Sequence, residues 1–174
     1  MIEKDGISAK MLKFFIGLSV VAFGSLCGYL CSKKYRQRKL FLSQWKEFTE
    51  RFLSEIAYYR RPIREFIAAY AYQVEFEDFL RKLPAENEGN AQGNRAFIIN
   101  ENYSFLTKED KRLLEDYFLM LGRGDSLSQK AYFSAVRENV VKSYSEAETQ
   151  CKRYGDLYIK LGFLCGLLIL LLII

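Results

Sequence analysis

The sequence predicts an all-α membrane protein. A cytoplasmic bundle of four main helices, arranged as two hairpins, is expected between an N-terminal and a C-terminal transmembrane helix. Two apolar runs near the ends of the 174-residue chain, the first without charge and the second with a single lysine, are each long enough to cross a bilayer. Between them, apolar residues recur at steps of three and four, the period of an amphipathic helix. The chain has only two prolines, which favours long helices.

The first span is predicted at residues 12–31, after an N-terminal extension at residues 1–11. Residues 14–31 carry no charge. Eighteen helical residues cover about 27 Å, close to the hydrocarbon thickness of a bilayer. A secretory signal peptide is the alternative, but no Ala-x-Ala cleavage site follows the run. We therefore expect a retained transmembrane helix.

The second span is predicted at residues 157–174, where Lys160 near its start can snorkel to the headgroups. Gly162 and Gly166 form a small-xxx-small pair, which permits close approach of another membrane helix. They are our candidate residues for membrane-helix packing, and a homo-oligomer through this face is possible. The alternative is that glycine is simply frequent in such helices.

The positive charge of the chain is concentrated just after the first span. The net charge is +5, and residues 33–39 alone carry five basic side chains. The positive-inside rule then places the middle of the chain, residues 32–156, in the cytoplasm. A nucleic-acid-binding domain would spread its basic residues over a folded face, so no nucleic-acid partner is expected.

The first half of the middle region is predicted to be a helix pair followed by a loop. Residues 40–60 repeat apolar side chains on one helical stripe, and this helix can run on from the first span. Pro62 suits the first turn of a second helix, expected to continue to about Leu83. Residues 84–102 are rich in Gly, Asn and Glu, which predicts a flexible loop.

The second half of the middle region is predicted to be another helix pair. Thr107 and Asp110 have the spacing of a capping box at the start of the third helix. Gly122 suits the end of that helix. Asp125 or Ser126 is expected to cap the fourth helix, which can continue into the second span.

No catalytic, cofactor-binding or metal-binding site is predicted. The chain has no histidine, the commonest general base and metal ligand, and it lacks a phosphate-binding glycine loop. Cys27 and Cys31 have helical i, i+4 spacing, but thiolates within lipid are costly and no further ligand is near in sequence. We therefore do not expect an enzyme.

Three stretches carry a family resemblance. The first resembles a Glu-Ile-x-Tyr-x-x-x-Pro-Leu segment and uses Glu55, Ile56, Tyr58, Pro62 and Ile63. The second resembles a Leu-Gly-x-x-Asp-x-x-x-Gln segment and uses Leu121, Gly122, Asp125 and Gln129. The third and most specific resembles a closing glycine- and leucine-rich tail and uses Tyr154, Gly155, Leu157, Tyr158, Leu161, Gly162, Leu164, Gly166 and Leu167. Together with the two spans, they are similar to the stage III sporulation protein AB family of endospore-forming bacteria.

The resemblance implies a non-enzymatic platform in the assembly built between mother cell and forespore during engulfment. The family's helical domain is similar to a cytoplasmic domain of the platform proteins of type II secretion and type IV pilus machines. The implied partners are stage III sporulation protein AA, a secretion-type ATPase, and the stage III sporulation AC-to-AH proteins. The implied location is the mother-cell inner membrane. This chain departs from the family pattern at Ile63, in its N-terminal extension and in the loop at residues 84–102.

Candidate partner-binding residues flank the two predicted helix–helix turns. They are Glu55, Arg60, Arg61 and Asp125. The alternative for Asp125 is a helix cap, and for the other three a solvated charge. Two other functions stay open, namely a membrane-anchored adaptor of another envelope machine and a membrane-bound enzyme acting on lipid or cell wall.

Overall fold

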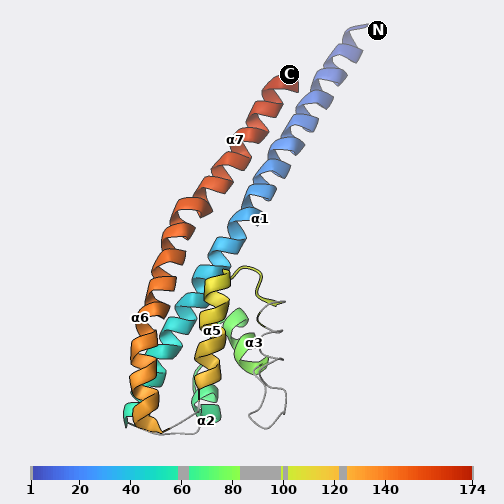
Figure 1. Cartoon of the computed structure of the whole chain (residues 1–174). Helices are drawn as coiled ribbons and strands as arrows, with labels where there is room; N and C mark the ends of the chain where they lie inside the picture. The colour runs from blue at the N-terminus through green and yellow to red at the C-terminus, as the bar shows by residue number, and fades with distance from the viewer. Residues whose placement is uncertain (1, 59–62, 83–98, 100–101, 122–124, 174) are drawn as a thin grey trace. The chain divides into compact units, whose positions relative to one another are not determined.

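The regular secondary structure of the described residues is entirely helical (Figure 1). The computed structural model describes residues 2–58, 63–82, 99, 102–121 and 125–173. The helices are α1 (Ile2–Tyr58), α2 (Ile63–Ala68), α3 (Val74–Lys82), α5 (Lys108–Met120), α6 (Ser126–Gln150) and α7 (Asp156–Ile173), with a π-helical turn at Cys151–Gly155. The all-α class predicted from the sequence is confirmed.

The chain divides into two compact units. The first contains both predicted spans, at residues 1–36 and 148–174, and the second contains residues 37–147. Helix α1 contributes residues to both units and is unbroken from Ile2 to Tyr58. The first span and the first helix of the middle region are therefore one helix. The chain is also helical from α6 through the π-helical turn into α7.

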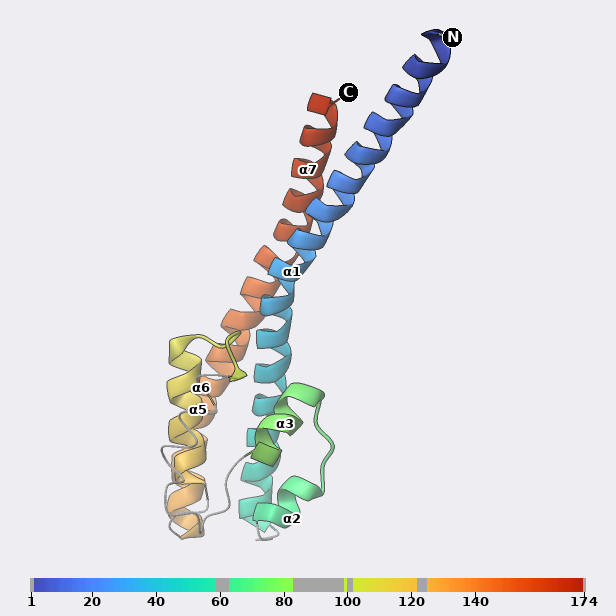
Figure 2. The same cartoon turned by 90° about the vertical axis from the view of Figure 1, so that its right-hand side faces the viewer.

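The single helix predicted from Pro62 to Leu83 is wrong, because α2 and α3 are separate helices. Figure 2 shows α2 and α3 as two separate helices. Phe48 of α1 contacts Phe66 of α2 and Phe76 of α3, at ring-centroid distances of 5.3 and 5.8 Å. Tyr72, between the two helices, lies 5.9 Å from the same ring. In one continuous helix, Tyr72 would point roughly 120° away from Phe66 around the helix axis. The break at residues 69–73 brings all three rings to one face of α1.

A hydrogen-bonded turn at Gln73 starts α3. The Gln73 backbone N–H donates to the side-chain oxygen Oε1 of Gln44 at 3.1 Å. The Gln73 carbonyl accepts from the backbone N–H groups of Phe76 and Glu77. Gln44 of α1 thus satisfies a backbone group that a continuous helix would have used internally.

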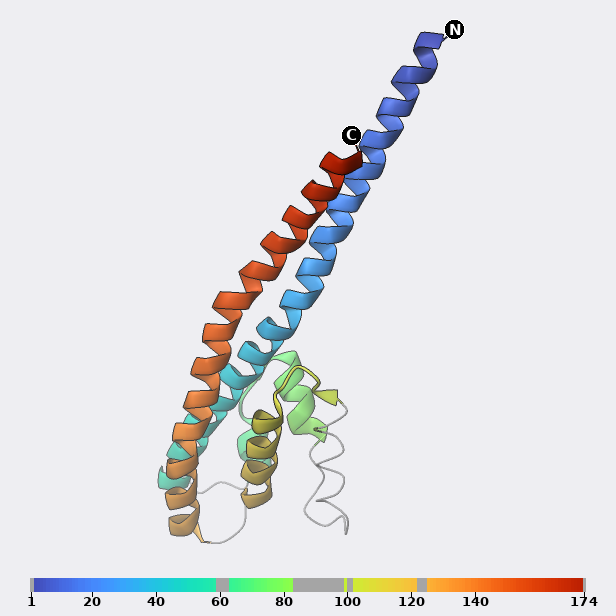
Figure 3. The same cartoon turned by 45° about the horizontal axis from the view of Figure 1, so that its top comes forward.

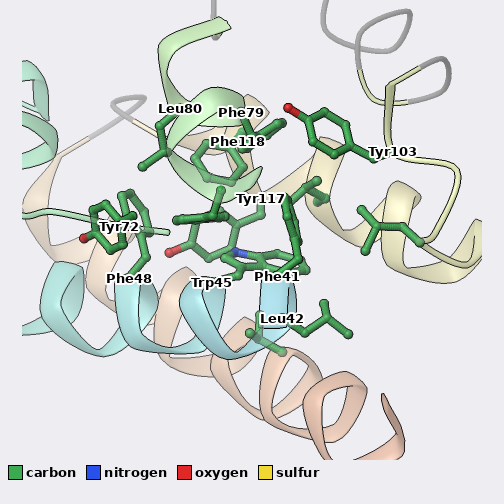
Figure 4. Packing of buried hydrophobic residues seen from close by; sticks show 14 of the residues in the cluster. Phe41, Leu42, Trp45, Phe48, Tyr72, Phe79, Leu80, Tyr103, Tyr117 and Phe118 are labelled. Atoms are coloured by element: carbon green, nitrogen blue, oxygen red, sulfur yellow. The ribbon is translucent and has the colours of Figure 1, made fainter. Parts of the chain in front are cut away.

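The core of the second unit is predominantly aromatic (Figure 4). Trp45 and Phe48 of α1 and Tyr117 of α5 are each 0% exposed. The rings of Trp45 and Tyr117 meet edge to face at 5.4 Å. Burial of each such side chain contributes roughly 1.5–3 kcal/mol, so this contact between α1 and α5 is a main source of stability.

Helix α6 covers another side of α1 in the second unit (Figure 3). Phe133 of α6 meets Phe52 of α1 at a ring-centroid distance of 5.0 Å. Lys46 of α1 lies over the ring of Tyr144 at 5.4 Å. The face of α6 that packs in the core carries the buried side chains Phe133, Val140 and Ala147.

The start of α5 confirms the predicted capping box. The Asp110 backbone N–H donates to Thr107 Oγ1 at 3.1 Å, and the Thr107 N–H donates to Asp110 Oδ2 at 3.0 Å. Helix α5 ends at Met120, and Leu121 is extended. Gly122, predicted to end this helix, lies outside the described residues, as does most of the predicted loop at 84–102. Ile99, which is described, is buried in the aromatic core.

Candidate functional site

Two helical stretches are long and apolar enough to cross a membrane. They lie within residues 16–57 and 127–172, and only 17% and 11% of their most apolar windows are buried. A core helix of a soluble protein would bury most of such a window. Instead, large apolar side chains such as Phe23, Leu164 and Leu172 are exposed. This is the surface expected of helices that face lipid.

A seam of glycines holds the two apolar stretches together in the first unit. A Cβ added to Gly24 of α1 would lie 2.7 Å from the carbonyl oxygen of Gly162 of α7, and one added to Gly162 would meet the carbonyl of Gly24. A Cβ on Gly166 would lie 2.7 Å from the Val21 Cα. Real Cβ atoms do not approach backbone this closely, so side chains here would force the helices apart. Close backbone approach is how membrane helices associate without a hydrophobic driving force.

The seam extends beyond these residues in both directions along the two helices. A Cβ on Gly17 would meet Leu170, and a Cβ on Gly28 would meet the backbone of Tyr158. The predicted packing residues Gly162 and Gly166 therefore face the first span of the same chain. Their role in a homo-oligomer is untested and stays a prediction.

The pairing is antiparallel and places the inner ends of both apolar runs at one level. A Cβ on Gly155 would lie 3.5 Å from the Oγ of Ser32. One turn further, the ring of Tyr35 lies 5.5 Å from that of Tyr154. The chain thus leaves the first apolar run beside the point where it enters the second.

A buried ion pair links α1 to α5 in the second unit. The Arg38 Nε donates to Asp110 Oδ2 at 2.7 Å and its Nη2 donates to Oδ1 at 3.1 Å. The two side chains are 5% and 2% exposed. This fork-to-carboxylate geometry is the strongest form of a protein ion pair. Of the five basic residues after the first span, Arg38 is therefore a structural residue of the core.

The predicted partner-binding residues do not form one described surface. Glu55 is 4% exposed and buried, which differs from the exposed group expected at this turn. Arg60 and Arg61 lie outside the described residues. Asp125 is exposed, and its carbonyl accepts from the Gln129 N–H at 3.0 Å at the start of α6. The binding role of all four residues stays a prediction.

Asp125 immediately precedes α6, so it stands at the N-cap position that the capping alternative assigns to it. Hydrogen bonds from the side chain and backbone of Ser128 hold the pKa of the Asp125 carboxyl below its usual range.

Sequence reasoning missed Arg38 and the glycines of the first span. Gly24 and Gly28 show the same small-xxx-small spacing as Gly162 and Gly166, so the signal was present. Arg38 carried no such signal, because it stands in a basic run that the positive-inside rule explains fully. Its partner Asp110 is 72 residues away.

Within the described residues, no group of three Cys, Asp or Glu side chains is placed to hold a metal ion. Cys27 and Cys31, considered above as a metal pair, are both free and exposed on α1.

Comparison with known proteins gives one family match. The family model of stage III sporulation protein AB matches residues 13–174. No curated protein matches the chain, and no solved structure matches it.

Proposed function

The chain belongs to the stage III sporulation protein AB family, and we propose that it is a membrane platform for a secretion-type ATPase in the complex between mother cell and forespore. The family match indicates a role in sporulation. The platform role, the ATPase and the membrane concerned are our proposal. The protein would work through binding rather than through catalysis.

The observation that carries the proposal is the register of the paired spans. Ser32 and Gly155 are neighbours at the inner ends of the two apolar runs. Residues 37–147, which lie between them in the chain, form one compact unit. A unit attached at both ends to one helix pair is held against a single face of the membrane. Such a tether suits a platform on which a soluble motor assembles.

The basic residues at the inner ends support a cytoplasmic orientation. Lys33, Lys34 and Arg36 follow the first span and are exposed, and Lys152 and Arg153 precede the second and are also exposed. Basic residues beside a span favour the cytoplasmic side. We therefore propose that residues 37–147 face the mother-cell cytoplasm, where an ATPase finds its nucleotide.

The docking partner that we propose is stage III sporulation protein AA, with the AC-to-AH proteins assembled around the same platform. The test is co-purification of the ATPase with the full-length protein from detergent-solubilised membranes. Wild-type protein should retain the ATPase. Absence of the ATPase from the wild-type eluate, with both proteins present in the extract, would contradict the proposal.

The position of Asp125 allows its charge to be separated from its cap. Asp125→Ser keeps a good N-cap but removes the carboxylate, whereas Asp125→Ala removes both. If Asp125 contacts the ATPase, both variants lose it. If Asp125 only caps α6, Asp125→Ser retains the ATPase. Arg60→Glu and Arg61→Glu test the other predicted turn in the same assay.

The orientation has a separate test. In a cysteine-free background, Ser134→Cys places a thiol at an exposed position of α6. A membrane-impermeant maleimide should label it only after the cells are permeabilised. Labelling in intact cells would place residues 37–147 outside and exclude an ATPase partner.

A further inference from the structure

We infer that the first unit carries a binding surface for anionic phospholipid headgroups at the inner end of the paired spans. We call this surface the interfacial basic belt. It consists of Lys33, Lys34, Arg36, Lys152 and Arg153. The inference is independent of the ATPase proposal.

The register of the two helices assembles the belt from opposite ends of the sequence. Gly24 lies opposite Gly162, and Ser32 lies opposite Gly155. The contact between Tyr35 and Tyr154 carries the same register one turn beyond the apolar runs. The basic residues of α1 therefore lie level with those of the π-helical turn.

The belt is exposed and lined by aromatic rings. All five basic residues are exposed, and the Lys152 side chain is 72% exposed. The guanidinium of Arg36 lies 6.0 Å from the ring centre of Tyr29, and that of Arg153 lies 5.6 Å from the ring centre of Tyr154. Tyrosines are typical of the membrane–water interface. A guanidinium held over a ring keeps its N–H groups free to bind a phosphate in bidentate fashion.

Acidic side chains around the belt do not neutralise it. Glu148 forms an ion pair with Lys152 at an N–O distance of 3.2 Å. Asp156 is exposed in the first turn of α7. Two carboxylates thus face five basic groups, so the surface keeps an excess of positive charge.

The ligand that fits this surface has an anionic group and an apolar part, because the belt borders exposed apolar side chains. Leu30 of α1 and Leu157 of α7 are 57% and 45% exposed, and they lie three residues from Lys33 and four residues from Arg153 in sequence. A free phosphate would use only the charged half of this surface. An anionic phospholipid uses both, with its phosphate on the belt and its acyl chains along the exposed leucines.

The test is lipid retention by the full-length protein in a neutral detergent, measured by native mass spectrometry. The probes are phosphatidylglycerol and phosphatidylcholine, which differ in headgroup charge. We expect wild-type protein to bind phosphatidylglycerol at least tenfold more tightly, and to lose this preference at high salt. Equal retention of the two lipids by wild-type protein would overturn the inference without any variant.

A matched pair of variants locates the site. Arg36→Gln with Arg153→Gln should lower the preference for phosphatidylglycerol by up to about 25-fold, since each basic residue near an anionic surface contributes about fivefold. Lys130→Gln with Lys142→Gln removes two exposed charges from α6 in the second unit and should leave the preference unchanged. An unchanged preference in the belt variant would overturn the inference. Displacement of phosphatidylglycerol by inorganic phosphate, but not by sodium chloride at the same ionic strength, would overturn it too, because a free phosphate would then be the ligand.

Discussion

Arg38 and Asp110 form a buried, two-point ion pair between α1 and α5, with Nε and Oδ2 2.7 Å apart. The same carboxylate accepts a hydrogen bond from the Thr107 backbone N–H. One side chain thus closes the capping box of α5 and fixes this helix to α1. The ion pair therefore constrains the orientation of α5 on α1 independently of the aromatic contacts.

Asp110→Asn should destabilise the second unit by about 3 kcal/mol, because it leaves the buried Arg38 guanidinium without a counter-charge. The asparagine oxygen can still accept from Thr107, so the cap is kept and the loss reports the ion pair. The single tryptophan, Trp45, is buried in this unit and reports its unfolding by fluorescence during denaturant titration of the full-length protein.

Two further variants control this prediction. Asp116→Asn removes an exposed carboxylate of the same helix and should change the free energy of unfolding by less than about 0.5 kcal/mol. Arg38→Met combined with Asp110→Asn should cost less than Asp110→Asn alone, since no buried charge remains. A single Asp110→Asn variant as stable as wild-type protein would show that the pair contributes nothing.

Phe48→Ala should lower the free energy of unfolding of the second unit by about 3–5 kcal/mol. Phe48 is fully buried and touches rings from α2, α3 and α5. Its removal leaves a cavity where these helices meet. Leu127→Ala is the control, because Leu127 is 78% exposed and should change stability little. Similar losses for both variants would mean that the aromatic cluster is not the core.

Gly162→Leu should separate the two spans, because the seam leaves no room for a Cβ at this position. The measurement is the distance between spin labels at Leu18 and Leu168 in a cysteine-free background. We expect an increase of roughly 2 Å, toward the ordinary spacing of packed helices. Leucine as the background residue at position 165, an exposed position of the same helix, should leave the distance unchanged. An unchanged distance in Gly162→Leu would contradict the seam.

Alkaline pH should destabilise the second unit. Burial raises the pKa values of Tyr72, Tyr103 and Tyr117 above their ordinary value. These phenols stay neutral in the folded protein, so their stabilising effect is complete below the unfolded-state pKa of about 10 and is lost as the pH rises above it. The denaturation midpoint followed by Trp45 fluorescence should be constant to about pH 9 and fall beyond pH 10.

A conservative variant tests whether the buried tyrosines cause the loss of stability at alkaline pH. Tyr117→Phe removes the most deeply buried of these phenols and should make the decline above pH 10 shallower. Tyr29→Phe, at a half-exposed ring of the first unit, should leave the decline as it is. A midpoint that does not change with pH would show that these tyrosines ionise equally in both states.

Local patterns in the sequence were sufficient for most of the helices. The Thr107–Asp110 spacing, the apolar stripe of residues 40–60 and the two apolar runs each depend on neighbouring residues. The break between α2 and α3 was not predictable in this way, because it is set by the fit of Tyr72 against Phe48. A continuous helical stripe from Phe66 to Phe79 could be drawn through the sequence only by leaving Tyr72 out.

The candidate site was less accessible to sequence reasoning, because its features are pairings of distant residues. The basic run predicted an orientation, but its member Arg38 belongs to the core through Asp110. Gly162 and Gly166 predicted a helix contact, but the identity of the partner depends on the matching spacing of Gly24 and Gly28. Glu55 was predicted to bind a partner because it lies near a turn in the sequence. The structure buries it, because burial depends on how other helices pack, which the position in the sequence does not reveal.

The most direct test of the platform proposal is the location of the ATPase, stage III sporulation protein AA, in sporulating cells with and without this chain. We predict that the ATPase sediments with membranes when the chain is present and moves to the soluble fraction when the chain is deleted. Restoring the full-length protein should return the ATPase to the membrane fraction and restore heat-resistant spores. An ATPase that stays on the membrane in the deleted strain would contradict the proposal that this chain is its platform.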